Sequence, residues 1–166
     1  EIVDAAHRVG LMVVVHISTL GDALDLLELG VDAFVHVWDD HGIPVEDVEA
    51  FYAAEVFVVP TLAVHEQVKN YYLENNIENE MLALSDIQKN VSILHQNGIP
   101  ILAGTDPPNL GINYGSSLYH ELALLVDSGL TPVEALKSGT SNASKHFGLD
   151  SHGILKLGMA ANFILV

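Results

Sequence analysis

The sequence contains no cysteine, so disulfides, thiolate zinc sites and cysteine nucleophiles are all excluded. Basic residues are also scarce: 6 Lys and Arg stand against 22 Asp and Glu, which gives a net charge of −16. This deficit argues against nucleic acid or an anionic membrane as a partner, because clustered Lys and Arg bind both. No apolar run approaches the roughly 18 residues of a membrane span.

The composition that remains is typical of a chain with a large core. Hydrophobic residues make up 49% of the 166 residues and charged residues only 17%, which excludes an acidic disordered chain. The length fits one domain or a piece of a larger one. The chain begins at Glu1 inside a predicted helix and closes on the apolar residues 163–166, so we expect that both ends are cut. No secretory signal is visible, and we expect a cytoplasmic protein.

Four short apolar runs rich in β-branched residues predict strands that are covered on both faces of a parallel sheet. Helical patterns separate these runs, and strand–helix alternation predicts βαβ units. Four strands suffice for half of an eight-stranded barrel or for a small open sheet, and the pattern alone leaves both open. The runs span residues 11–17, 33–37, 56–61 and 99–105.

Apolar residues spaced by three and four positions predict the helices between and after the strands. Residues 131–134, Thr-Pro-Val-Glu, match a capping box with Pro at the first helical position. Residues 62–79 are polar and aromatic, which predicts an inserted loop or lid over the strand ends. The helices are predicted near residues 1–9, 20–29, 45–51, 81–94, 118–126 and from 132 onward.

Three polar residues end apolar runs in the positions where α/β enzymes carry their sites. His16 and His36 end the first two runs, and Asp106 follows the fourth. The carboxyl ends of parallel strands form a common rim, where the sites of barrels and open sheets lie. Two imidazoles and a carboxylate at one rim can bind a divalent metal such as zinc. A single histidine near a strand end is more often a core or loop residue with one satisfied hydrogen bond, so spacing alone leaves both interpretations open.

Polar residues that follow the third and fourth runs are weaker candidates for contacts with a substrate. Loops at the strand ends carry specificity in such folds, although each of these side chains could equally be solvated or packed. They are His65, Tyr71, Tyr72, Asn109, Asn113 and Tyr114.

The order of these motifs resembles the C-terminal half of the amidohydrolase superfamily, in its imidazolonepropionase-like and prolidase-like branch. The resemblance covers nearly the whole chain. It implies strands five to eight of a (βα)8 barrel over residues 1–152, and over residues 153–166 the start of a return to a small β-sandwich. The matching stretches are residues 14–16, 30–36, 101–106, 120–122, 129–136 and 153–166.

The resemblance also implies roles for the three strand-end residues. His16 and His36 resemble the metal-binding histidines of the family's fifth and sixth strands. Asp106 resembles the aspartate of the eighth strand, which ligates metal and moves protons. The family's His-x-His pair and its carboxylated lysine have no counterpart, and Asn162 stands where the family commonly has Asp.

The function implied by the resemblance is metal-dependent hydrolysis of a C–N bond, in an amide, a peptide or a cyclic amide. The expected cofactor is a divalent metal, zinc first, with one or two ions in the complete barrel, and the expected partner is a small amide or dipeptide-like substrate. Exposed strand edges favour a homo-oligomer, so a catalytically inactive half-barrel stabilised by self-association is the alternative. A nucleotide-binding module is disfavoured, because no glycine-rich phosphate loop follows any strand.

Overall fold

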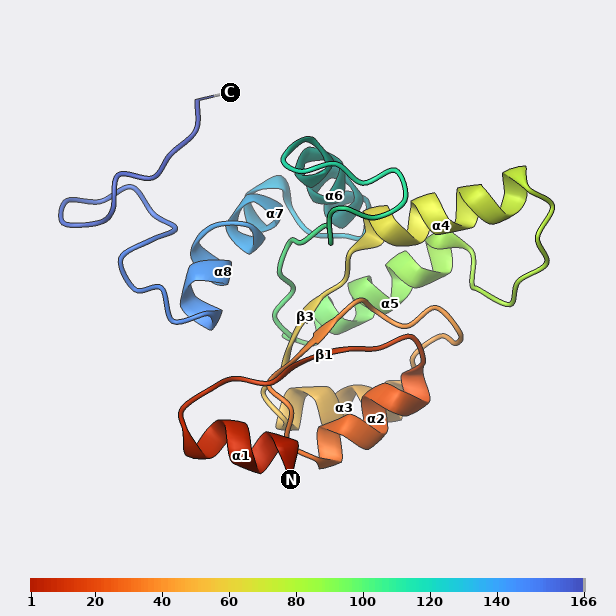
Figure 1. Cartoon of the computed structure of the whole chain (residues 1–166), viewed down its shortest axis with the longest axis horizontal. Coiled ribbons are helices and arrows are strands. Elements are labelled where there is room, and N and C mark those ends of the chain that lie inside the picture. Colours follow the sequence, from red (N-terminus) through yellow and green to blue (C-terminus); the bar gives the residue numbers. More distant parts are fainter. Residues whose placement is uncertain (166) are drawn as a thin grey trace.

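A computed structural model describes residues 1–165 and shows an α/β fold with a parallel sheet at its centre (Figure 1). The strands lie in the order β1, β2, β3, so each is adjacent to its neighbour in sequence. Both pairings are parallel and in register, which requires a helical crossover between successive strands. The three strands are β1 (Val14–His16), β2 (Ala33–Val35) and β3 (Phe57–Val59).

The fourth predicted strand is present as a single parallel bridge and not as a full strand. Ile101 bridges to Val58 of β3. Val58 N–H donates to the Pro100 carbonyl at 2.9 Å, and Leu102 N–H donates to the Val58 carbonyl at the same distance. Residues 99–105 therefore extend the sheet beyond β3, at the edge opposite β1. The parallel α/β prediction is confirmed, and the fourth run is correctly placed but shorter in its pairing than predicted.

Helices follow each strand and cover the sheet. In Figure 1, α1, α2 and α3 gather on one side of the strands, and α4, α6 and α7 lie on the other. The capping box predicted at Thr131 is confirmed, because its hydroxyl accepts from Glu134 N–H while the Glu134 carboxylate accepts from Thr131 N–H. The helices are α1 (Ile2–Arg8), α2 (Leu20–Glu28), α3 (Val45–Ala53), α4 (Leu62–Glu74), α5 (Leu84–Gln96), α6 (Ser116–Asp127), α7 (Pro132–Ser138) and α8 (Ser141–His146).

Helix α4 corrects the prediction of a loop or lid over residues 62–79. Most of that segment is helical, and its first turn is buried. The helix begins directly after β3 and packs against α5 and α6. Apart from His65, its polar and aromatic residues lie in the later, more exposed turns, which explains why no apolar stripe is visible in the sequence.

The core lies between the sheet and the helices. Phe34 of β2 is fully buried, and its ring centroid lies 5.9 Å from that of Phe51 on α3. Trp38, just after β2, is also fully buried and lies 5.2 Å from the same ring. The middle strand is thus enclosed, whereas Val14 on the edge strand β1 remains 36% exposed.

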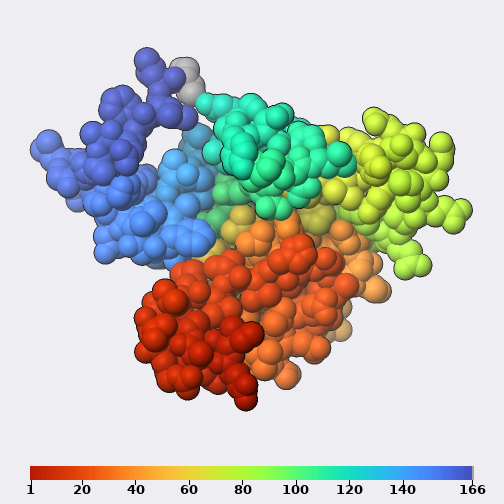
Figure 2. Space-filling view, in the orientation of Figure 1, coloured from red at the N-terminus to blue at the C-terminus, as the bar shows by residue number. Residues whose placement is uncertain are grey.

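The C-terminal tail after α8 contains no helix or strand within residues 153–165. It projects away from the body, as the dark blue segment of the space-filling view shows (Figure 2). The return to a β-sandwich over residues 153–166 stays a prediction, and its last residue, Val166, lies outside the described residues. Among residues 1–165, no helix is long and apolar enough to cross a membrane.

Candidate active site

The three strand-end residues predicted from the sequence meet at one cleft of about 220 Å³. The ring centroids of His16 and His36 lie 4.7 Å apart. His36 Nε2 lies 3.9 Å from Asp106 Oδ2. His16 belongs to β1, His36 follows β2 directly, and Asp106 follows the run that bridges to β3, so three adjacent segments of the sheet each bring one side chain.

The backbone at this rim is strained. His36, Thr61 and Asp106 have φ angles of 68°, 50° and 48°, in the left-handed region that residues other than glycine rarely adopt. Each such residue costs on the order of 1–3 kcal/mol, and residues of this kind cluster at functional sites. All three sit where a strand or a strand-like run ends, so the chain turns sharply at the rim of the cleft.

Thr61 fixes the tautomer of His36. The Thr61 hydroxyl donates its one hydrogen to the Pro60 carbonyl at 2.8 Å, and the same oxygen is a hydrogen-bond partner of His36 Nδ1. Because a hydroxyl has a single hydrogen, the bond with His36 must be one in which Nδ1–H donates to Thr61. The neutral ring then carries its lone pair on Nε2, the atom that faces Asp106.

The environment keeps His36 neutral. Burial lowers its pKa from 6.5 to about 4, and the neighbouring His65 and His16 add to this effect, while Asp106 and Asp39 oppose it. Burial acts in this direction because a charged imidazolium loses more hydration than a neutral ring. At neutral pH, His36 is therefore a lone-pair donor and not a cation.

The other two predicted residues lie at more open positions. His16 is exposed, and the Asp106 side chain is 49% exposed. Asn109, a weaker candidate from the sequence, lines the cleft and donates from Nδ2 to Asp106 Oδ2 at 3.2 Å. This bond orients the carboxylate and leaves its other oxygen free of described partners.

His65 also lines the cleft, on the first turn of α4. Its Nδ1 lies 3.5 Å from Asp39 Oδ2, and its Nε2 is buried with no hydrogen-bond partner among the described residues. The remaining weak candidates, Tyr71, Tyr72, Asn113 and Tyr114, do not line this cleft.

Sequence reasoning missed two residues that the geometry brings to the site, Thr61 and Asp39. Thr61 is the last residue of the third apolar run, so the rule that selected His16, His36 and Asp106 would have selected it as well. Asp39 lies three residues beyond His36 in a loop, and no spacing rule points to it. It contacts His65, which the sequence placed only as one of several weak candidates.

The donor set matches a divalent metal in its chemistry but covers only part of a site. Two imidazoles, one of them held neutral with Nε2 free, and a carboxylate are suitable zinc donors. No group of three His, Cys, Asp or Glu side chains within residues 1–165 is arranged to hold a metal ion by itself. The assignment of His16, His36 and Asp106 as metal ligands therefore stays a prediction.

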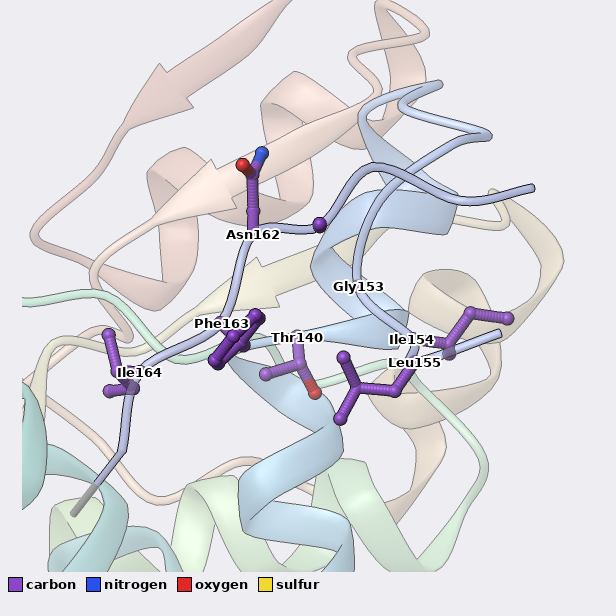
Figure 3. Close-up of a pocket in the computed structure, with 8 residues that line it drawn as sticks. Thr140, Gly153, Ile154, Leu155, Asn162, Phe163 and Ile164 are labelled. Atoms are coloured by element: carbon purple, nitrogen blue, oxygen red, sulfur yellow. The ribbon is translucent and has the colours of Figure 1, made fainter. Parts of the chain in front are cut away.

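A larger cavity of about 640 Å³ lies under the C-terminal tail and provides a contrast (Figure 3). Its walls are mainly apolar and include Leu155 and Phe163, with Thr140 on the side of α8. None of its lining residues is titratable, so it offers no acid or base. The chemistry of the described chain is concentrated in the smaller cleft.

Comparison with known proteins gives a family match over the full length of the chain. The model of the amidohydrolase family matches residues 1–166. No curated protein sequence matches the chain.

Solved structures share the fold over nearly the whole chain. A putative prolidase from Bifidobacterium longum is 25% identical with a TM-score of 0.80, and the match covers 96% of this chain and 42% of that one. A Xaa-Pro dipeptidase with methionine bound in its active site is 20% identical with a TM-score of 0.76, covering 96% and 40%. Ochratoxinase from A. niger is 24% identical with a TM-score of 0.72, covering 96% and 36%. The chain thus spans about two fifths of the length of these structures, as a partial barrel would.

Proposed function

Because the chain belongs to the amidohydrolase family, we propose that it supplies half of the active site of a metal-dependent hydrolase that cleaves a C–N bond. Family membership and the prolidase-like structures support hydrolysis as the reaction type. The observation that carries the proposal is the convergence of His16, His36 and Asp106 on one cleft. We propose an amide of small size as the substrate: a dipeptide, an N-acyl amino acid or a cyclic amide.

His36 Nε2, the His16 ring and the Asp106 carboxylate would hold a divalent metal, with zinc as the first candidate. Such an ion makes hydroxide available at neutral pH and polarises a substrate carbonyl. His36 is suited to this role because Thr61 occupies its Nδ1 and burial keeps the ring neutral. Further ligands would have to come from outside these three residues.

Asp106 has a second role in the proposal, the movement of protons. One carboxylate oxygen is held by Asn109, and the side chain is half exposed to the cleft. In that position it can accept the proton of the attacking water and pass it to the leaving amine, as a general base and then a general acid. The C–N bond breaks as the amine receives this proton.

Zinc titration of the purified chain tests the proposal. We expect zinc binding by the parent chain and at least about tenfold weaker binding by His16→Ala and Asp106→Ala, since each variant loses one donor. His152→Ala is the matched control, because the side chain of His152 hydrogen-bonds only to Ser151 among the described residues and does not line the cleft. If no form of the chain binds zinc, the metal site is refuted. It is also refuted if His16→Ala and Asp106→Ala both bind zinc as tightly as the parent chain and the control.

The alternative is a catalytically inactive half-barrel that is stabilised by self-association. Two observations favour it: the cleft holds no complete metal-ligand set among residues 1–165, and β1 pairs only with β2, so its outer edge is open. An open edge strand pairs readily with another chain. Solution mass separates the two: an inactive homo-oligomer supports this alternative, and a stable monomer contradicts it.

A further inference from the structure

Helix α4 begins in an unusual way beside the candidate active site. Its N-cap residue is Thr61, whose side chain makes no cap hydrogen bond. A threonine at this position ordinarily accepts a hydrogen bond from a backbone N–H of its own first turn. Here Thr61 has a left-handed backbone instead of the extended one of an ordinary N-cap, and its hydroxyl bonds to the Pro60 carbonyl and to His36 Nδ1. The first turn of α4 therefore needs another acceptor.

Glu121, on the neighbouring helix α6, supplies that acceptor. Its Oε1 accepts from Leu62 N–H at 3.1 Å and its Oε2 from Ala63 N–H at 2.8 Å. Glu121, Leu62 and Ala63 are all fully buried, so water cannot take the place of the carboxylate. A buried N–H group without an acceptor is costly, which makes this pairing necessary for the start of α4.

Helix α7 shows what the same residue types do away from the site. There Thr131 caps its own helix, and Glu134 of the same helix completes the box. In α4 the N-cap Thr61 bonds to His36 instead. The capping Glu121 lies at least 58 positions further along the chain than the N–H groups that it accepts from. The two N-cap threonines differ in backbone conformation, left-handed in Thr61 and extended in Thr131, and only the hydroxyl of Thr61 bonds a residue outside its own helix region.

We propose that Glu121 is a positioning residue for His36: by capping α4, it leaves the Thr61 hydroxyl free to hold His36 as the Nδ1–H tautomer with Nε2 directed at the metal site. The inference deepens the proposed function and rests on it for the identity of the ligand that Nε2 binds. The tautomer itself is a property of the chain and can be measured without metal.

The test begins with the tautomer of His36. Long-range ¹H–¹⁵N spectra of the ¹⁵N-labelled, metal-free chain at pH 7.5 report which ring nitrogen carries the proton. We expect Nδ1–H for the parent chain. In Glu121→Gln, one N–H of α4 loses its acceptor, Thr61 relaxes to an extended backbone from which its hydroxyl caps α4, and His36 populates both tautomers.

Zinc titration gives the second measurement. We expect Glu121→Gln and Thr61→Val to weaken zinc binding by about 10–100-fold, the range for partners that orient a ligand. Thr61→Ser keeps the hydroxyl, so this variant should have the same His36 tautomer and the same zinc affinity as the parent chain. Glu134→Gln is the matched control, because it removes a capping carboxylate from α7 and should change neither measurement.

The outcomes separate this inference from the proposed function. If Glu121→Gln folds, as judged by circular dichroism, and keeps the parent tautomer, the inference is overturned. If that variant does not fold, Thr61→Val decides, because it keeps the Glu121 cap and removes only the hydroxyl; an unchanged tautomer again overturns the inference. If the parent chain binds no zinc but the tautomer changes as expected, the proposed function fails for this chain and the positioning role of Glu121 stands.

Discussion

The two histidines at the candidate site occupy contrasting strands. His36 follows the middle strand β2, is buried, and is held by Thr61 through a hydrogen bond. His16 ends the edge strand β1 and is exposed, and its side chain makes no hydrogen bond within residues 1–165. The comparison teaches that the candidate site is built outward from the enclosed strand: the histidine there is oriented by the fold, whereas the histidine at the edge lacks support on one side.

The largest expected difference between β2 and β1 is the loss of stability when a side chain of each strand is truncated. We expect Phe34→Ala in β2 to cost about 3–5 kcal/mol of unfolding free energy, because it removes a fully buried ring and leaves a cavity. Val14→Ala in β1 should cost about 1 kcal/mol or less, since that side chain is already partly solvated. Urea denaturation followed by circular dichroism measures both. Similar losses in the two variants would mean that β1 is as enclosed as β2.

The buried groups His36 and Glu121 are expected to change the stability of the chain with pH in opposite directions. The folded pKa of His36, about 4, lies below its unfolded value of 6.5, so this residue makes stability rise with pH between these values. Burial raises the pKa of Glu121 from 4.5 to about 7, despite its bonds to Leu62 and Ala63 N–H. The stability that Glu121 contributes is therefore fully present below pH 4.5 and is lost as the pH rises through 7.

Because the two groups act in opposite directions, we expect their contributions to offset each other in the parent chain across pH 4.5–6.5. Each contribution is roughly 3 kcal/mol, from 1.36 kcal/mol per pKa unit. Glu121→Gln should leave a stability that rises with pH in this window, and His36→Gln one that falls. Urea denaturation at several pH values checks the slopes, and parallel slopes in the two variants would contradict the opposed roles.

The edge of the sheet opposite β1 can be tested through Gly104. A Cβ added there would overlap Val59 Cγ1 of β3, whereas a Cβ on Gly42 would meet nothing within 4 Å. We expect Gly104→Ala to cost about 1–3 kcal/mol, the range for overpacking, and Gly42→Ala to cost much less. Thermal unfolding of the pair measures the difference. An unchanged Gly104→Ala variant would show that residues 99–105 do not pack closely on β3.

Much of this arrangement could be predicted from the sequence because it follows from local patterns. The apolar runs located β1, β2 and β3, and the polar residues that close them located His16, His36 and Asp106. What could not be predicted depends on contacts between distant segments. The pairing of Glu121 with the start of α4 joins residues about 60 positions apart, and no local pattern encodes it. Helix α4 itself was missed because its buried face is confined to its first turn.

The smallest expected effect concerns His16 itself and completes the comparison with His36. We expect His16→Gln to change the unfolding free energy at pH 7 by less than about 0.5 kcal/mol, as is usual for an exposed side chain that makes no hydrogen bond. His36→Gln at the same pH should cost about 1–3 kcal/mol, because a buried hydrogen bond to Thr61 is lost. Urea denaturation in the absence of metal measures both variants. If His16→Gln proves as costly as His36→Gln, then β1 supports its histidine through packing against the His36 ring, whose centroid lies 4.7 Å away, and the edge histidine is also oriented by the fold.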